Sequence, residues 1–374
     1  MKLKALVVLT LSFMLLLPQT ISAQSESTKY NAKELKKAIP DEIMGYIPDE
    51  FTEIDDVTEL AQLTDTDTLL SFIKDSVKGC FKPFSETLLS LLSFIFTASL
   101  INVTKNSFKN DHFSEIVSYL SVLSLSLLLY NIFVSVFELT GIFMSSIDLL
   151  IKSLLPIMTA LYVSGGNLTT AVINNSGISL LITLLNNIYT DLMTPLIKVC
   201  FGLTIANAIG RFDGISKIIS LLKKMFTFIL TASATLLSIF LLFKTNLSAA
   251  ADGTAVRTIK FAGSFIPVVG GALGESVRSI MSGISLIKNS VGFIGIIIII
   301  FITVPPVLTI LMNKLCVDIS ACFSSLLGCD SEEKILSSFS SLLGFYLALT
   351  VCSAIILILV LTVFVMISPA LGGA

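Results

Sequence analysis

The sequence predicts an all-α, polytopic transmembrane helix bundle, and its composition, its charge-free intervals and its N-terminus each point that way. Of the 374 residues, 54% are hydrophobic and only 13% are charged, with a mean hydropathy of +0.92. Soluble domains carry about 25% charged residues. This chain therefore has too few charges to cover its own apolar surface in water, and lipid must cover that surface instead.

Residues 1–23 have the pattern of a cleavable signal peptide. Lys2 and Lys4 precede an apolar stretch from Ala5 to Leu17, and the small residues that end at Ala23 resemble a cleavage site. An uncleaved anchor helix is the alternative, but the apolar stretch is short for a full membrane crossing. We therefore expect cleavage after Ala23 and an extracytoplasmic N-terminus.

The next segment, residues 24–83, is the polar part of the chain. It holds seven lysines against thirteen acidic residues, a balance of −6. Helical spacing at Ala32–Ile39 and Leu69–Val77 predicts a small extracytoplasmic helical region. The segment has no calcium-loop glycine and no nearby histidine, so an acidic surface is favoured over a metal site. The aspartates concerned are Asp55, Asp56, Asp65 and Asp67.

The remainder, residues 84–374, is predicted to be a multi-pass transmembrane domain of about six to eight spans, because a helix needs about 20 apolar residues to cross. Between Ile178 and Ile209 two alternatives stay open, since Pro195 either divides two short helices or marks a re-entrant hairpin. The charge-free intervals are Thr87–Thr104, Ile116–Phe137, Ser153–Thr190, Met225–Phe243, Asn289–Asn313 and the region of Leu343–Ile367.

The placement of lysine and arginine predicts the orientation. With the N-terminus outside, the first span ends in the cytoplasm at Lys105 and Lys109. The strongest basic loop, Arg211–Lys224, is expected on the same side. Residues 244–288 are then extracytoplasmic although they are net positive, which conflicts with the same rule. The candidate residues for contact with a cytoplasmic partner are Arg211, Lys217, Lys223 and Lys224.

Asp148 and Lys152 lie four residues apart in an otherwise apolar run, so on a helix they share a face and can pair. Ionisable groups at membrane depth usually mark a bundle interior or a water-filled path. The alternative is a pair near the membrane interface, with the Lys152 side chain reaching toward water. Pro156, one turn further on, is expected to loosen the helix.

A stretch rich in glycine and charge begins at Asp252. Gly270–Ser276 has the glycines of a phosphate loop, but Glu275 stands where a lysine is required, so a nucleotide site is not expected. A broken helix or re-entrant segment is expected at Pro267–Gly271. The candidate residues of this stretch are Asp252, Arg257, Lys260, Pro267, Gly270, Glu275 and Lys288. Further on, Gly292 and Gly295 should allow close helix packing, and Pro305-Pro306 should kink the helix.

The sequence gives no reason to expect an enzyme, a cofactor or a metal site. His112 is the only histidine, the net charge is −2, and no HExxH or CxxC motif occurs. That charge does not indicate a nucleic-acid partner either. The six cysteines are interpreted as small apolar fillers of helix surfaces.

The order of residues after Ala250 resembles the stage III sporulation protein AE family of endospore-forming bacteria. A weaker match covers Pro195-Leu196 and the basic segment to Lys224. The residues that carry the main resemblance are Ala251-Asp252-Gly253, Arg257, Lys260-Phe261, Ile266-Pro267-Val268-Val269-Gly270, Glu275, Ile287-Lys288-Asn289 and Gly292.

The resemblance implies a role in sporulation, in the mother-cell membrane around the engulfed forespore. It implies membership of a multi-protein assembly that resembles a specialised secretion system and sustains late forespore gene expression. The expected partners are a secretion-type ATPase, ring-forming membrane proteins, membrane lipid and a second copy of the chain. This chain looks like the permease-like, polytopic platform of that assembly.

Three functions stay open at this point. The first is a non-enzymatic membrane core whose basic loop meets the ATPase and whose acidic N-terminal region meets the ring proteins. The second is a self-sufficient secondary transporter with a path formed by Asp148, Lys152 and the break at Pro267–Gly271. The third is a structural scaffold that has no path of its own.

Overall fold

The computed structural model describes residues 66–105, 111–164, 172, 176–180, 183–184, 187–210, 214–233, 235 and 270–366. These residues are helical apart from a turn at 327–329, and they contain no strand. The signal peptide, residues 24–65 of the acidic region and residues 252–269 lie outside them. The all-helical fold class is confirmed for the described part of the chain.

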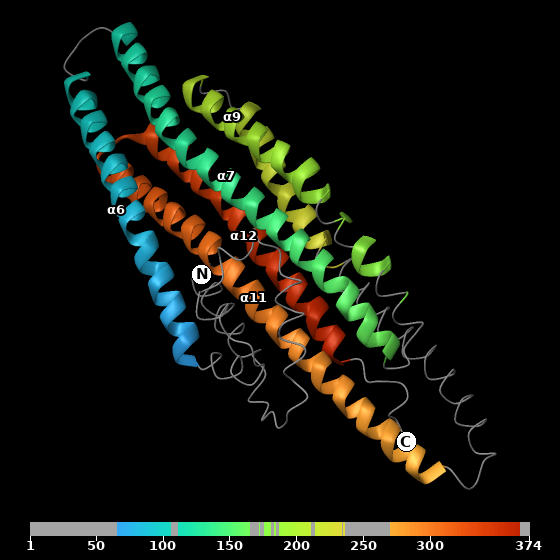
Figure 1. Ribbon diagram of the computed structural model, residues 1–374. Helices are drawn as coiled ribbons and strands as arrows, with labels where there is room; N and C mark the ends of the chain where they lie inside the picture. The colour runs from blue at the N-terminus through green and yellow to red at the C-terminus, as the bar shows by residue number, and fades with distance from the viewer. Residues whose placement is uncertain are drawn as a thin grey trace.

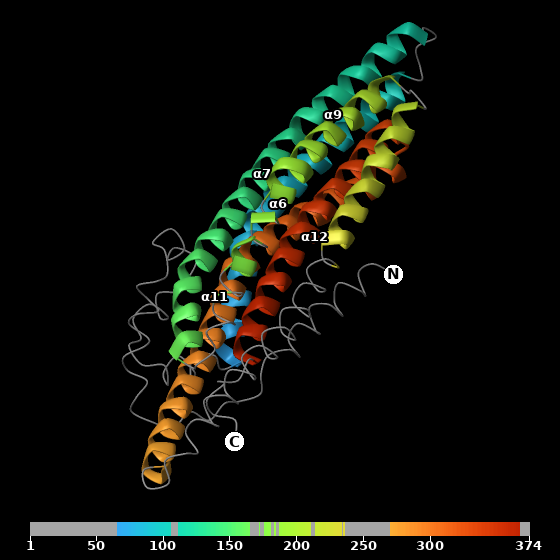
Figure 2. The ribbon, with the colours of Figure 1, turned by 90° about the vertical axis from the view of Figure 1, so that its right-hand side faces the viewer.

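Long helices lying side by side form an elongated bundle (Figures 1 and 2). A further helical stretch covers residues 214–233. The named helices are α6 (Thr66–Lys105), α7 (Asp111–Ser164), the π-helical turn η2 (Ile188–Met193), α9 (Thr194–Gly210), α11 (Gly270–Leu326) and α12 (Asp330–Met366).

Five segments of the described residues are long and apolar enough to cross a membrane. The expected count of about six to eight spans stays a prediction, because residues 236–269 lie outside the described part. The candidate spans are Ser71–Thr104, Ile116–Ser164, Ile188–Ile209, Gly295–Leu326 and Asp330–Thr362.

A tight turn folds α12 back along α11. Gly328 has a φ of 72°, a backbone conformation that glycine adopts without the steric cost of a Cβ atom. Its amide donates to the Ser325 carbonyl at 3.2 Å, and the Cys329 amide donates to the Ser324 carbonyl at 2.9 Å. This pair of hydrogen bonds is the Schellman arrangement, which satisfies the last carbonyls of α11.

Contacts between side chains fix the directions of the other helices. α6 runs parallel to α11, because Phe72 packs on Phe301 and Asn102 donates to the Gly328 carbonyl at 3.1 Å. α7 runs parallel to α12, because Ser121 donates to Glu332 near their starts and its Phe133 lies against Tyr346 further along.

α9 runs antiparallel to α7. The rings of Phe133 and Phe201 stack with their centroids 4.6 Å apart, and Lys198 lies over the ring of Phe137. These directions bring five helix ends together at one end of the bundle, which we call the turn end (Figure 1). They are the ends of α6, α9 and α11 and the starts of α7 and α12. α7 leads away from the turn end and α9 leads back to it, so the start of α7 and the end of α9 lie at the same end of the bundle.

Prolines are accommodated within continuous helices. α7 runs through Pro156 and α11 runs through Pro305 and Pro306. Pro195 follows η2, where the Thr194 amide bonds to the Tyr189 carbonyl five residues back. Proline has no amide hydrogen, and a π-turn is one way to absorb that missing donor. Residues 188–209 therefore form one segment of crossing length that runs through Pro195. Residues 181–182 and 185–186, which separate it from Ile178, lie outside the described part.

Close packing at Gly295 confirms its expected role. A Cβ atom there would lie 2.7 Å from Leu361 Cδ1 of α12 and 3.5 Å from Leu154 Cδ1 of α7. Three helices meet at this point, and a side chain here would require Leu361 to move.

We predict that Gly295→Val lowers the free energy of unfolding by about 1–3 kcal/mol, because a branched side chain overpacks this three-helix contact. Thermal unfolding of the purified chain in detergent measures the change. Gly79→Val is the matched control, since a Cβ atom at Gly79 meets nothing within 4 Å. Equal melting temperatures for the two variants would contradict the prediction.

We also predict that the turn end faces the cytoplasm, because Lys105 and Lys217 lie near it. In a chain whose native cysteines are replaced by serine, Lys217→Cys and Asp330→Cys should react with an impermeant maleimide only from the cytoplasmic side. Lys74→Cys, toward the opposite end of α6, should react only from outside. Labelling of Lys217→Cys and Asp330→Cys from opposite sides would contradict the parallel register of the helices.

Candidate functional site

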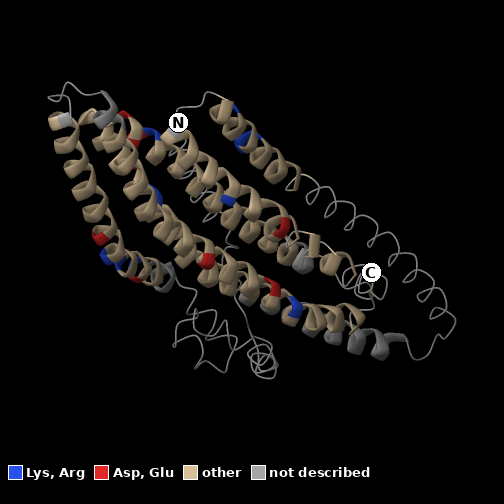
Figure 3. Cartoon of the chain, turned by 90° about the horizontal axis from the view of Figure 1, so that it is seen from above, with Lys and Arg blue, Asp and Glu red and all other residues tan. Residues whose placement is uncertain are grey.

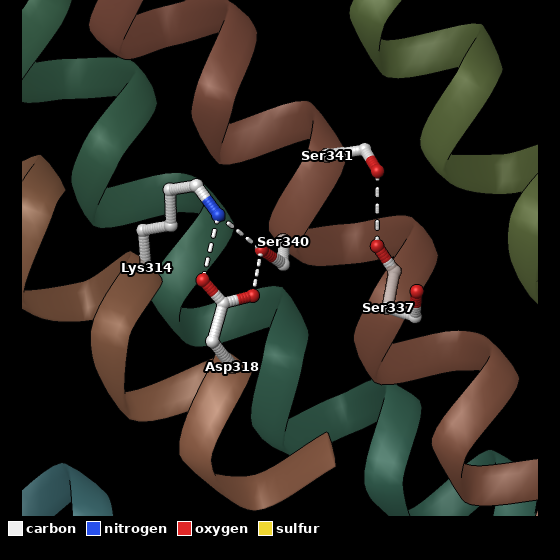
Figure 4. A network of polar contacts seen from close by, with 5 residues as sticks. All are labelled: Lys314, Asp318, Ser337, Ser340 and Ser341. Atoms are coloured by element: carbon white, nitrogen blue, oxygen red, sulfur yellow. Dashed lines mark hydrogen bonds and ion pairs between the residues drawn. The ribbon is translucent and has the colours of Figure 1, made fainter. Parts of the chain in front are cut away.

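A polar network joins α11 and α12 (Figure 4). Lys314 Nζ lies 2.7 Å from Asp318 Oδ2 on the same helix and 2.6 Å from Ser340 Oγ of α12. The Ser340 hydroxyl donates in turn to the other oxygen of Asp318. Three groups therefore close a ring of contacts within candidate membrane spans, where an unpaired charge would be costly.

The network was not among the predicted sites, although its signal is present in the sequence. Lys314 and Asp318 have the i,i+4 spacing that predicted the pair at Asp148 and Lys152. Lys314 also directly follows the charge-free interval Asn289–Asn313, and this position makes it resemble the end of a span. Sequence alone does not indicate Ser340, because only the hairpin brings α12 beside Lys314.

A second polar region lies at the turn end. Glu332 is 8% exposed and accepts a hydrogen bond of 2.5 Å from Ser121 of α7. Beside it is a cavity of about 170 Å³ that α6, α7 and the start of α12 line, with Asn102 and Asp330 among its walls. Asp330, Glu332 and Glu333 lie in the first turn of α12, where the helix dipole favours negative charge. We interpret these contacts as stabilising the hairpin of α11 and α12.

Asp148 and Lys152 pair, as their spacing predicts. Lys152 Nζ lies 2.6 Å from Asp148 Oδ2, and the side chains are 70% and 19% exposed respectively. Lys152 therefore lies on the outer surface of α7, whereas Asp148 is largely covered by the bundle. No observation tests its functional role, which stays a prediction.

In the basic segment Arg211–Lys224, which was expected to be a loop, residues 214–224 are helical, and residues 211–213 lie outside the described part. Residues 214–233 are helical, because their apolar positions pack on neighbouring helices, as Phe226 does on Phe345 of α12. Lys223 is half-buried and close enough to Cys200 of α9 to interact with it electrostatically. Lys217 and Lys224 are exposed, whereas Arg211 lies outside the described residues.

The candidate stretch that begins at Asp252 is only partly described. Its members Asp252, Arg257, Lys260 and Pro267 lie outside the described residues, so the expected break at Pro267–Gly271 is not tested. Gly270 is the first residue of α11, and Glu275 and Lys288 lie within that helix. Gly292 is buried further along the same helix.

The described residues hold no group of three His, Cys, Asp or Glu side chains placed to bind a metal ion. All six cysteines are free. Cys200, Cys316 and Cys329 are buried, and Cys322 is exposed. Charged side chains are sparse along the described helices (Figure 3).

We predict that Lys314 and Asp318 are energetically coupled. Lys314→Met or Asp318→Asn alone leaves the other charge without its partner, so each should cost more stability than the two together. The coupling energy from a double-mutant cycle of thermal unfolding should be about 0.5–3 kcal/mol.

Asp75 and Lys78 provide the control pair for this cycle, because they pair at 3.0 Å with side chains 70% and 67% exposed. Their coupling should stay at or below about 1 kcal/mol. A coupling at Lys314 and Asp318 no larger than the control would contradict the structural importance of the network.

Comparisons with known proteins now bear on the identity of the chain. It is 26% identical over 216 residues to stage III sporulation protein AE of Bacillus subtilis (strain 168), which covers 57% of this chain and 53% of that protein. The chain thus matches about half the length of this curated relative. No solved structure matches the chain.

The family model described as stage III sporulation protein AE matches residues 55–368. That interval contains every helix described above. It also contains the polar network, the turn end and the stretch from Asp252 to Lys288. The chain belongs to the stage III sporulation protein AE family.

Proposed function

We propose that this chain is the permease-like membrane core of a multi-protein channel complex that resembles a specialised secretion system. The complex would lie in the mother-cell membrane around the forespore and sustain late forespore gene expression. Family membership implies a role at stage III of sporulation. The observation that carries the proposal is that the family match covers a bundle of candidate membrane spans with polar groups at membrane depth.

The two ends of the bundle suit different partners. The helix over residues 214–233 begins at the turn end with the exposed Lys217, and the exposed Lys224 lies about two turns further along it. These lysines would attract an acidic surface of a secretion-type ATPase that docks from the cytoplasm at the turn end. α6 begins at the opposite end, so the acidic residues 24–65 that precede it would enter the intermembrane space. Ring-forming proteins there are the proposed partners of that region.

A self-sufficient transporter is the weaker candidate. It would use Asp148 and Lys152 as part of a substrate path. Lys152 is 70% exposed on the outer surface of α7, which is not where an intramolecular path would run. Uptake of a solute by the purified chain in liposomes, abolished by Asp148→Asn, would favour the transporter instead.

We predict that Lys217→Glu with Lys224→Glu lowers recovery of the ATPase when the tagged chain is crosslinked and purified from sporulating cells. Quantitative mass spectrometry of the partners measures the loss, which should be about tenfold or more because two attractive charges become repulsive. Sporulation efficiency should fall with it.

Lys74→Glu with Lys82→Glu is the matched control, since it makes the same charge change on exposed residues of α6 away from the turn end. It should leave ATPase recovery unchanged. Equal recovery from both double variants would contradict the docking of the ATPase at the turn end. Purification of the chain with none of these partners would overturn the complex-core proposal.

A further inference from the structure

The exposed face of α7 changes character along its length. From Ile116 to Tyr130 it is mostly apolar, with Leu120 60% and Leu127 70% exposed. From Asn131 onward the exposed positions are mostly polar or small. We call these positions the outer polar stripe: Asn131, Ser135, Glu138, Gly141, Ser145 and Lys152.

The stripe keeps helical spacing, so it is one continuous face of α7. Ile142, 49% exposed, is the large apolar residue beside it. An α-helix that contacts lipid normally shows an apolar surface, because hydrocarbon offers no partner to polar groups. Residues 116–130 of α7 meet this condition and the stripe does not, so wherever the stripe lies within the hydrocarbon another surface must cover it.

α9 contributes a charge next to the stripe. Lys198 is exposed, and its Nζ lies 4.1 Å from the centre of the Phe137 ring. It sits near the middle of the candidate span Ile188–Ile209, about 15 Å from either end at 1.5 Å per residue. That is too far for a lysine side chain to reach water easily, so its charge needs a partner within the membrane.

Glu138 follows Phe137 in the chain and is also exposed. In the described part of the chain, neither Glu138 nor Lys198 forms an ion pair, and they do not pair with each other. Two opposite charges therefore lie at similar depth on one face, with the Phe137 ring beneath Lys198.

We propose that the outer polar stripe and Lys198 form the interface with a second copy of this chain. A two-fold contact places the same face of each copy against the other, so Glu138 of one copy meets Lys198 of the other, and the reverse. Such a contact pairs both charges and covers the polar positions of α7. Because this face carries both the negative Glu138 and the positive Lys198, it can pair with the same face of a second copy.

Charge exchange between two differently tagged full-length chains tests this interface. Both wild-type chains should co-purify from detergent-solubilised membranes. Glu138→Lys in both chains, or Lys198→Glu in both chains, places like charges at both contacts and should lower co-purification about tenfold or more.

The decisive combination pairs Glu138→Lys in one chain with Lys198→Glu in the other. Both contacts between copies are then attractive again, so co-purification should return to within about twofold of wild type. Pairing inside one chain cannot give this result, because each chain alone carries two like charges. Glu86→Lys, on an exposed site of α6, is the control and should change nothing.

Several outcomes overturn the proposal. Wild-type chains that do not co-purify exclude it, and so do single reversals without effect. No recovery in the exchanged combination excludes it when size-exclusion profiles show that both variants are folded. If the reversed variants misfold, cysteine crosslinking replaces charge reversal. One tagged chain then carries Glu138→Cys and the other carries Lys198→Cys, both in a background without native cysteines. A disulfide between the two tagged chains in native membranes supports the interface, and its absence excludes the contact.

Discussion

The left-handed turn at Gly328 determines where the other described helices lie. It folds α12 back on α11 and brings Ser340 beside Lys314. α6 then follows α11 in parallel, and α7 follows α12 in parallel, because each buries an apolar stripe against one side of the hairpin. A side chain at position 328 would strain this turn, on which these contacts depend.

The length of the bundle sets a second constraint. α7 has 54 residues and α11 has 57, which correspond to about 80–85 Å at 1.5 Å per residue. A bilayer core is about 30 Å thick, and tilt adds only a little to the length it can hold. Part of the bundle must therefore lie outside the hydrocarbon. The start of α11, which extends past the neighbouring helices (Figure 2), carries Glu275 and Lys288 and suits water.

Sequence patterns predicted the helical membrane fold and the pairing of Asp148 with Lys152, since both depend on local periodicity and spacing. Close packing at Gly295 was also predicted from residue type. Local patterns could not show that α7 continues through Pro156, because packing on neighbouring helices overrides the proline there. They also missed the Lys314 network, which needs a contact between residues 26 positions apart.

The lysines within the candidate membrane spans differ in the partners that the chain gives them. Lys152 has Asp148, and Lys314 has both Asp318 and Ser340. Lys198 has an aromatic ring, which stabilises a cation but does not neutralise it. Since the same chain supplies carboxylates to two of these lysines, the lack of one at Lys198 indicates a surface completed from outside. The unpaired Glu138 beside it has the charge that a second copy would contribute.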